Sequence, residues 1–298
     1  MTASSECVPV LEEARVLQPE WKRIVRVFYR RKLAMVGLVI VMLMILVAIF
    51  APVLAPYDPY DTDIINKLQP PSSEHWLGTD QVGRDTLSRV IYGTRTSLIV
   101  GVCAVILAAV IGQLLGLIAG FFGGWVYSVI MRLIDAMMAI PMIVLALVIS
   151  SVLGGGVKNV IIALAIGGIP GQCRMMCAQT LSVKENDYVM AGRTIGVGSW
   201  RMMLRHIYPN AFAPCLVMMT IAVGATILAE AGLSFLGAGI NPPTAAWGSM
   251  IDGGYSYLSS DPILSIAPGV CIALIVFGFN MMGDGLRDAL DPRLRGTV

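Results

Sequence analysis

Long runs of apolar residues alternate with polar segments along the whole chain. Each run has at least about 20 residues, enough for an α-helix to cross the roughly 30 Å hydrocarbon layer of a bilayer. The charged residues inside these runs are Asp135, Arg174 and Glu230. The pattern predicts an all-α polytopic membrane protein with six transmembrane helices, at residues 33–55, 97–122, 133–153, 160–181, 211–236 and 263–282.

The first run is predicted to be a retained membrane anchor. It has about 23 apolar residues, whereas a secretory signal peptide has about 7 to 15 after a short basic stretch. It also follows a long basic leader. The chain is therefore expected to divide into the leader (1–32), the anchor (33–55), an external segment (56–96), a five-helix core (97–282) and a tail (283–298).

The external segment changes character along its length. Four prolines between residues 56 and 71 indicate an extended chain. Further on, Leu87, Val90 and Ile91 have helical spacing and follow Thr79 and Asp80, which are candidate helix caps. A short helix lying at the membrane interface is expected there.

Composition and charge agree with a membrane protein. The chain is 56% hydrophobic and 13% charged, with a net charge of +2. Its basic residues lie mainly beside the ends of the predicted helices, so they indicate no nucleic-acid partner. Short loops rich in Lys and Arg remain on the cytoplasmic side. The last external loop has Asp252 and Asp261 and no Lys or Arg, so both termini are expected in the cytoplasm. The basic residues of the leader are Arg15, Lys22, Arg23, Arg26, Arg30, Arg31 and Lys32.

Glycine and proline mark special positions within the runs. Gly112, Gly116 and Gly120 recur every four residues, which places three positions without side chains on one helix face and predicts a close helix contact. Bends are expected at Pro141, Pro170 and Pro268.

The loop from Ser182 to Asn210 is too polar to lie in the membrane and is predicted to contain two short helices. Ser182 and Glu185 have capping-box spacing, so a first helix is expected from there to about Ile195. The glycines at 196 and 198 then supply the left-handed conformation that ends a helix.

The second helix of the loop is expected to begin after Ser199 as its cap. It carries Arg201 and Arg205 and is predicted to stop at Pro209, just before the fifth apolar run. A helix, a glycine hinge and a second helix held under the membrane suit docking into a groove on a soluble partner.

Four segments of the chain carry a recognisable pattern: WLGTDQVGRDTLSRVIYGTRTSL at 76–98, DYVMAGRTIGVGSWRMMLRHIYPN at 187–210, LSFLGAGINPPTAAWGSM at 233–250 and GDGLRDALDPRLR at 283–295. Together they resemble the inner-membrane permease subunits of the peptide and nickel importer family, within the binding-protein-dependent ABC transporters. The resemblance extends over nearly the whole chain and implies the type I ABC importer permease fold in a bacterial or archaeal cell membrane.

The resemblance implies that the loop is the coupling motif that docks into a cleft of an ATPase subunit. In that motif a Glu-Ala-Ala triplet is followed by a glycine. Here Met190, Ala191 and Gly192 occupy the triplet, so the glutamate is absent, and Glu185 and Asp187 are the nearby acids that can substitute for it. The candidate coupling residues are Glu185, Asp187, Tyr188, Met190, Ala191, Gly192, Gly196, Arg201, Arg205 and Pro209.

The implied partners are a homologous permease, two ATPases and an external substrate-binding protein. The chain has no G-x-x-x-x-G-K-[ST] phosphate-binding loop, so ATP and Mg²⁺ are expected on the ATPases and no cofactor or enzymatic activity on this chain. Dipeptides or oligopeptides are the expected cargo. Nickel complexes or glutathione remain alternatives, as does a secondary transporter that works without ATPases.

The charged residues within the runs have separate interpretations. Asp135 lies one turn from Arg132, and pairing or snorkelling can satisfy both Asp135 and Arg174. Glu230 is a candidate for the transport pathway, because an ionisable group within a span is often functional. No metal site is predicted, since the methionine pairs are adjacent and point about 100° apart on a helix.

Overall fold

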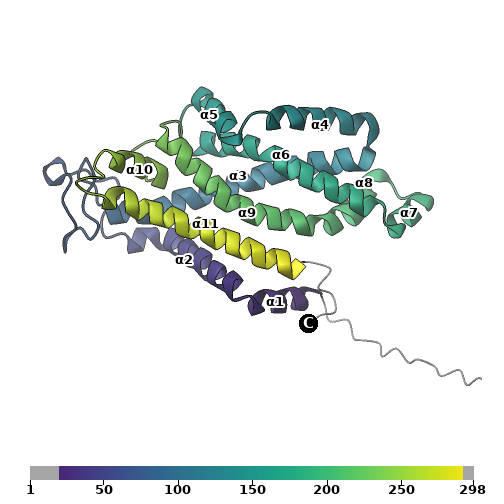
Figure 1. Cartoon of the computed structure of the whole chain (residues 1–298), viewed down its shortest axis with the longest axis horizontal. Helices are drawn as coiled ribbons and strands as arrows, with labels where there is room; N and C mark the ends of the chain where they lie inside the picture. Colours follow the sequence, from purple (N-terminus) through teal and green to yellow (C-terminus); the bar gives the residue numbers. More distant parts are fainter. Residues whose placement is uncertain (1–19, 291–298) are drawn as a thin grey trace, which may run out of the picture.

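The computed structural model describes residues 20–290, which form a bundle of long helices lying side by side along one axis (Figure 1). These residues contain no β-strand, only an isolated bridge between Thr79 and Asp85. The elements are α1 (Glu20–Arg30), α2 (Lys32–Leu54), η1 (Ile64–Asn66), α3 (Thr86–Phe122), α4 (Gly124–Met138), α5 (Met142–Leu153), α6 (Val157–Lys184), α7 (Asp187–Thr194), α8 (Ser199–Arg201), η2 (Met202–Ile207), α9 (Tyr208–Phe235), α10 (Trp247–Tyr255) and α11 (Ile263–Leu290).

Five helical segments, α2, α3, α6, α8 to α9, and α11, are each long and apolar enough to cross a membrane. The third predicted span is instead the pair α4 and α5, which meet at an angle of 86°. Pro141 causes the break, because proline lacks the N–H that continues a helix and disfavours helical geometry at the preceding residue. The predicted count of six is reached when the bent pair is taken as one span. The helices α6 and α11 continue through Pro170 and Pro268.

The separate interfacial helix predicted in the external segment is wrong. Thr79 and Asp80 lie in a loop, and Leu87, Val90 and Ile91 belong to α3, which runs unbroken for 37 residues. Asp85 caps it: its carboxylate accepts the backbone N–H of Ser88 at 2.7 Å. A helix of this length spans about 56 Å and exceeds the hydrocarbon layer, so its external end rises beyond the membrane.

The closest packing joins α3 to α6, as the glycine pattern predicts. A Cβ atom at Gly112 would lie 2.7 Å from the Ile169 carbonyl oxygen, and one at Gly120 would lie 2.7 Å from the Thr180 Cβ. At Gly116 it would collide with the Cys173 carbonyl oxygen. Only glycine allows the two backbones to approach this closely.

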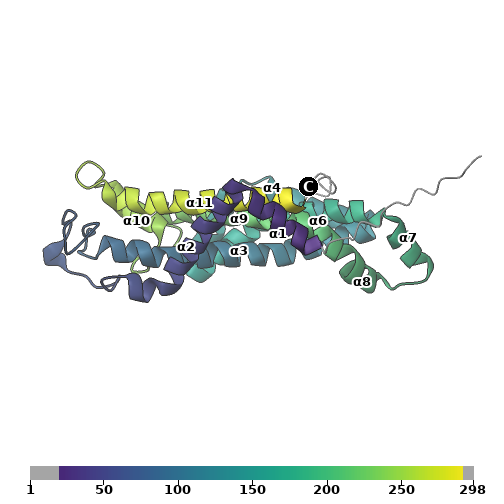
Figure 2. The same cartoon turned by 90° about the horizontal axis from the view of Figure 1, so that it is seen from below.

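The predicted anchor α2 packs on the bundle through one face and exposes the other. Its small residues meet α11, where a Cβ at Gly37 would lie 2.7 Å from the Gly278 carbonyl oxygen. Arg31, just before α2, pairs with Asp288 of α11 at 3.1 Å. Beyond Lys32 at its start, the exposed face of α2 carries only apolar side chains, such as Val39, Leu46 and Ile49, which suits contact with lipid. Figure 2 shows α2 crossing the bundle at an angle.

Candidate functional site

The loop between α6 and α9 projects from one end of the bundle, opposite the end that carries the external segment (Figures 1 and 2). It contains α7, the glycine turn, and α8 with η2. The candidate coupling residues lie in this loop, except Pro209 in the first turn of α9, and all are exposed except Gly192, which is half-buried. The sequence therefore located the loop and its solvent-facing side chains.

The predicted capping box at the start of the loop is wrong. Ser182 lies inside α6, which continues to Lys184, and Glu185 is the residue that ends it. The reason is tertiary packing: Val183 is buried in a cluster with Leu117 and Phe121 of α3. This burial extends α6 by a turn, so α7 begins only at Asp187.

A left-handed conformation was expected at both glycines of the turn, Gly196 and Gly198, and only Gly196 adopts it. Gly196 has a φ of +80°, the left-handed conformation expected after a helix. Its N–H donates to the Arg193 carbonyl oxygen at 3.0 Å and closes the end of α7. Gly198 has an ordinary φ of −61°, and Ser199 makes no side-chain cap because it is already the first residue of α8.

The predicted stop at Pro209 is also wrong. Helical structure runs from Ser199 through Phe235, and Pro209 lies in the first turn of α9. The six residues before α9, Met202–Ile207, form a widened π-helical turn. A widened turn relieves the clash between a proline ring and the carbonyl group one turn earlier, here that of Arg205. The loop is thus joined rigidly to the fifth span.

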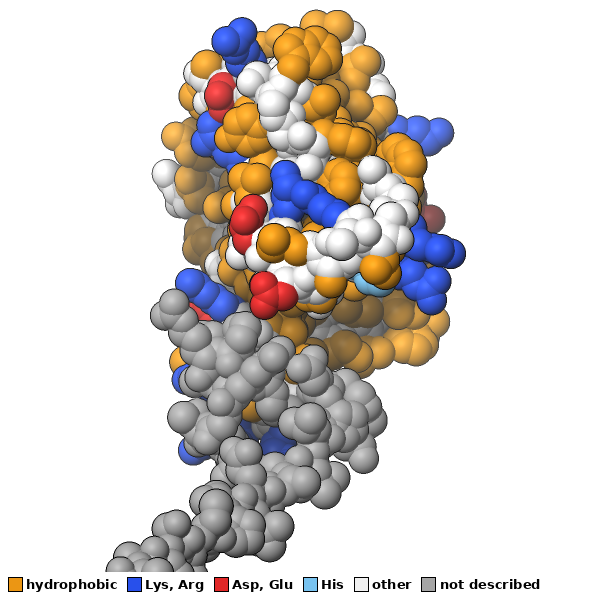
Figure 3. Space-filling view, turned by 90° about the vertical axis from the view of Figure 1, so that its right-hand side faces the viewer, with side chains coloured by type: hydrophobic (Ala, Val, Ile, Leu, Met, Phe, Trp, Pro, Cys, Tyr) orange, Lys and Arg blue, Asp and Glu red, His pale blue; other side chains and the backbone are white. Residues whose placement is uncertain are grey.

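The loop has a buried side and an exposed apolar side. Val189, Met202, Met203 and Ile207 are buried and fix it to the bundle. The large apolar side chains that face outward are Tyr188, Met190, Ile195, Trp200 and Leu204, with exposed fractions of 44, 59, 81, 63 and 52%. We call these five residues the coupling face. Figure 3 looks onto this end of the molecule, where apolar side chains lie among Lys and Arg. An exposed apolar patch with a charged rim is typical of a protein interface.

A buried polar network lies at the membrane end of this loop and was not found from the sequence. The Tyr208 hydroxyl donates to Gln113 Oε1 at 3.1 Å, and Gln113 Nε2 donates to Gln172 Oε1 at 3.3 Å. These side chains come from α9, α3 and α6. Their separations of 95 and 59 residues leave no local sequence signal. The network joins the loop to the two helices that pack most closely.

Glu230, the candidate pathway residue, lies in the interior of the subunit with no exposed surface. Its two carboxylate oxygens accept hydrogen bonds from Ser234 Oγ at 2.7 Å and Ser97 Oγ at 3.4 Å. Ser234 Oγ also accepts the Ile240 N–H at 2.9 Å. The carboxylate therefore joins α3, α9 and the loop that follows α9.

Glu230→Gln is expected to leave stability close to that of the wild type, because the amide keeps hydrogen-bonding atoms at both serines. Glu230→Leu removes both acceptors and is expected to lower stability by about 1–3 kcal/mol. Thermal unfolding of the purified protein in detergent would measure the two variants. If Glu230→Gln lowered stability as much as Glu230→Leu, the negative charge of Glu230 rather than its hydrogen bonds would stabilise the contact between α3, α9 and the loop after α9.

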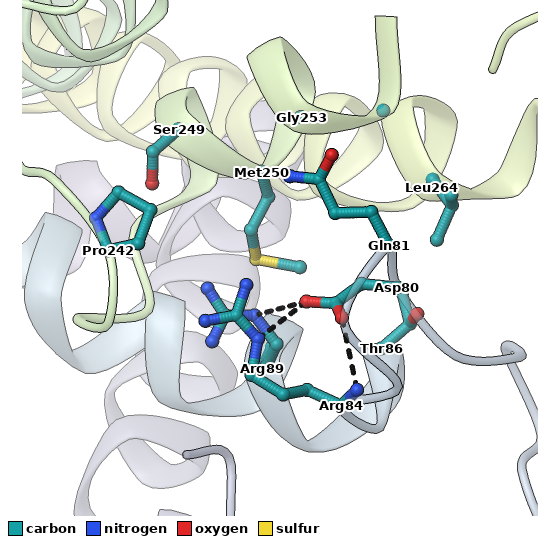
Figure 4. A pocket seen from close by; sticks show the side chains of 11 residues that line it. Asp80, Gln81, Arg84, Thr86, Arg89, Pro242, Ser249, Met250, Gly253 and Leu264 are labelled. Carbon is teal, nitrogen blue, oxygen red and sulfur yellow. Dashed lines mark hydrogen bonds and ion pairs between the residues drawn. The ribbon is translucent and has the colours of Figure 1, made fainter. Parts of the chain in front are cut away.

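An ionic cluster closes the external end of the bundle (Figure 4). Arg84 Nε and Arg89 Nε lie 2.7 and 3.5 Å from Asp80 Oδ2. Arg89 also donates to the carbonyl oxygens of Pro59 at 3.0 Å and Pro243 at 3.3 Å. These bonds tie the external segment to the loop before α10. The sequence signal was the block at 76–98, but its spacing alone did not indicate pairing.

Two further pairs involve charged residues and a histidine. Asp135 pairs with Arg174 rather than with Arg132, because α4 begins at Gly124 and lies alongside α6. His75 pairs with Asp85 at 2.9 Å at the external end. Within residues 20–290, no group of three or more His, Cys, Asp or Glu side chains is arranged to hold a metal ion.

Comparison with known protein families assigns the chain to one of them. Residues 112–296 match the model of the binding-protein-dependent transport system inner membrane component, which is more than half of the chain. The chain belongs to this family. Residues 20–71, which contain α1 and α2, match the N-terminal transmembrane domain of oligopeptide transport permease C. The protein is thus a multi-pass permease subunit of an ABC importer and not an enzyme, as its sequence suggested.

Two relatives align with this permease over almost its entire length. The dipeptide transport system permease protein DppC of Alkalihalophilus pseudofirmus is 41% identical over 295 residues, covering 99% of this chain and 97% of that protein. The glutathione transport system permease protein GsiD of Escherichia coli is 42% identical over 297 residues, with the same coverage.

Solved structures support the fold. A chain of the MetNI methionine ABC transporter in an inward-facing conformation superposes on the permease with a TM-score of 0.56 at 19% identity, covering 68% of this chain and 97% of that one. A second crystal form gives the same TM-score at 20% identity. The expected type I importer fold is therefore confirmed, and about a third of this chain lies outside the shared part.

Proposed function

We propose that this permease and a homologous permease together enclose the pathway for di- or oligopeptides, and that two separate ABC ATPases drive transport through the coupling face. The observation that carries this proposal is the coupling face itself. Its five large apolar side chains protrude from a loop that is fixed to the spans by buried residues. Movement of a bound partner would therefore move α6 and α9 directly.

Energy comes from the partner subunits in this proposal. ATP and Mg²⁺ bind to the ATPases, and this chain needs no cofactor of its own. The chain lacks the glycine-rich lysine motif that cradles nucleotide phosphates. An external substrate-binding protein delivers the cargo to the end of the bundle that carries α10 and the ionic cluster.

Peptide cargo is favoured by the relatives, which are a dipeptide permease and a glutathione permease. Peptides cannot dissolve through a bilayer, because each unsatisfied backbone polar group costs several kcal/mol in hydrocarbon. A water-filled protein path is therefore required. Glutathione is the second candidate cargo, because the similarity to its permease is as high as that to the dipeptide permease.

The proposed orientation puts both termini and the coupling face in the cytoplasm of a bacterial cell. The coupling loop carries Arg193, Arg201 and Arg205, and α1 with its basic residues lies toward the same end of the bundle (Figure 1). The opposite end has Asp252 and Asp261. This distribution follows the positive-inside rule.

The decisive experiment is uptake by the purified importer, copurified with its native partners and reconstituted into vesicles. Labelled dialanine and labelled glutathione would be offered separately with the binding protein. ATP-dependent accumulation of dialanine supports the proposal, and accumulation of glutathione alone would replace the peptide cargo. Uptake driven by an ion gradient without ATP would overturn the importer mechanism.

A further inference from the structure

The broken span α4–α5 places irregular backbone at membrane depth. Ala139, Ile140 and Pro141 connect the two helices, and all three are exposed in the isolated subunit. Backbone that leaves a helix inside the hydrocarbon layer is tolerated only where protein covers it or water reaches it. This side of the subunit therefore does not face lipid.

The ion pair between Asp135 and Arg174 lies at a similar depth. Asp135 is eleven residues past Gly124 on α4, and Arg174 is ten residues before Lys184 on α6. At a rise of 1.5 Å per residue, each is about 15 Å from the inner end of its helix. Half of a hydrocarbon layer is also about 15 Å thick, so a bilayer whose inner surface lies at these helix ends has the pair near its middle.

This ion pair is open on one side. The side chains of Arg174 and Asp135 are 50% and 56% exposed, and they border a hollow of about 350 Å³. The other residues that line it are Tyr127, Met131, Cys177, Ala178 and Leu181. Exposed charges at the bilayer centre are costly in contact with lipid and are found facing water-filled cavities or other protein.

The outer faces of α2 and α3 provide the contrast. At membrane depth α3 exposes Ile106, Val110 and Leu114 together with Cys103, and α2 exposes apolar side chains alone. These faces suit lipid. The exposed ion pair and the broken helix both lie instead on the side formed by α4, α5 and α6.

We propose that the hollow between α4 and α6 is part of the water-filled transport pathway, and that Arg174 contacts the carboxylate of the passing substrate there. The inference rests on the proposed function. It adds which face of the subunit lines the pathway and which chemical group of the substrate contacts Arg174. Dipeptides and glutathione both carry free carboxylates, which an arginine guanidinium binds in two-pronged fashion. Asp135 holds Arg174 in place until the substrate arrives.

Thiol labelling tests whether the hollow between α4 and α6, rather than the apolar face of α3, contacts water. Ala178→Cys introduces a thiol into the hollow, and the native Cys103 on the apolar face of α3 is the control. The whole importer in nanodiscs is treated with a charged, membrane-impermeant methanethiosulfonate, and modified cysteines are identified by mass spectrometry. Because the thiolate forms only in water, we expect the new thiol to react at least about ten times faster than Cys103. Equal, slow reaction of both would overturn the proposal.

Transport tests the role of the arginine. Arg174→Gln is expected to lower uptake of dialanine or glutathione, whichever the wild type imports, by about tenfold per assembled complex. Arg174→Lys keeps the charge but loses the two-pronged geometry, so a smaller loss of about threefold is expected. Arg132→Gln removes an exposed arginine of α4 that does not line the hollow, and uptake should stay unchanged. Equal uptake by the Gln and Lys variants would overturn substrate contact by this charge.

The two experiments separate this inference from the proposed cargo. Labelling needs no substrate, so it identifies the water-exposed face of the subunit even if the wild-type importer carries neither dialanine nor glutathione. Failure of the wild-type importer to take up either compound would instead overturn the proposed peptide cargo. An unreactive thiol at 178 that cross-links to the second permease would show that a subunit interface covers the hollow, which also overturns the pathway.

Discussion

Ile195→Asp is expected to release the ATPase subunits from this permease. Ile195 ends α7, is 81% exposed and belongs to the coupling face. A carboxylate there would have to lose its water on entering an apolar cleft, without a partner to replace it. A loss of about 2 kcal/mol or more is typical at the centre of an interface, which weakens association about 30-fold. The amount of ATPase that copurifies with the tagged permease measures the effect.

The matched control is Ile65→Asp at the opposite end of the molecule. Ile65 in η1 is 93% exposed, so the substitution brings the same charge to another exposed apolar residue. Normal copurification is expected for this variant. If Ile195→Asp also kept its ATPases, the coupling face would not be the docking surface, and its exposed side chains would need another partner.

The membrane spans could be predicted from the sequence because lipid imposes a simple length requirement. Twenty or so apolar residues in succession have few alternatives in a folded chain. The six runs accordingly correspond to α2, α3, the α4–α5 pair, α6, α9 and α11. Proline at 141 indicated a bend, but its size of 86° depends on how α5 packs against α6 and α9.

Helix ends were predicted less well, because local capping signals compete with packing. Ser182 and Glu185 have the right spacing for a cap, yet burial of Val183 carries α6 through them. Likewise Thr79 and Asp80 look like caps, but Asp85 makes the cap hydrogen bond of α3. The free energy of burying an apolar side chain exceeds that of one cap, so the packed alternative prevails.

The candidate site was predictable as a segment but not as a surface. Sequence resemblance singled out the loop, while the three-dimensional arrangement decides that Trp200 and Leu204 face outward and Met203 inward. The pairing of Asp135 with Arg174 was missed for a related reason. The two residues are 39 positions apart, and Arg132 is much nearer to Asp135 in sequence. Only the packing of α4 alongside α6 brings Arg174 to Asp135.

Gly116→Ala is expected to cause a large loss of stability by forcing α3 and α6 apart. The added Cβ would collide with the Cys173 carbonyl oxygen and lie 2.9 Å from the Cys177 nitrogen. Both are backbone atoms of α6, so no side-chain rotation relieves the contact and the helices must separate. Overpacking of this kind costs about 3 kcal/mol. Thermal unfolding in detergent, with size-exclusion chromatography to detect misfolded protein, measures the loss.

Gly269→Ala in α11 separates this collision from the general effect of replacing a helical glycine. A Cβ at Gly269 meets no atom within 4 Å, and alanine favours a helix by about 1 kcal/mol over glycine. The control should therefore be as stable as the wild type or slightly more so. The difference between the two alanine variants isolates the energy of the close α3–α6 contact. Equal stabilities would mean that α3 and α6 can move apart freely, in which case α6 could not transmit movement from the coupling face to the Arg174 ion pair as a rigid unit.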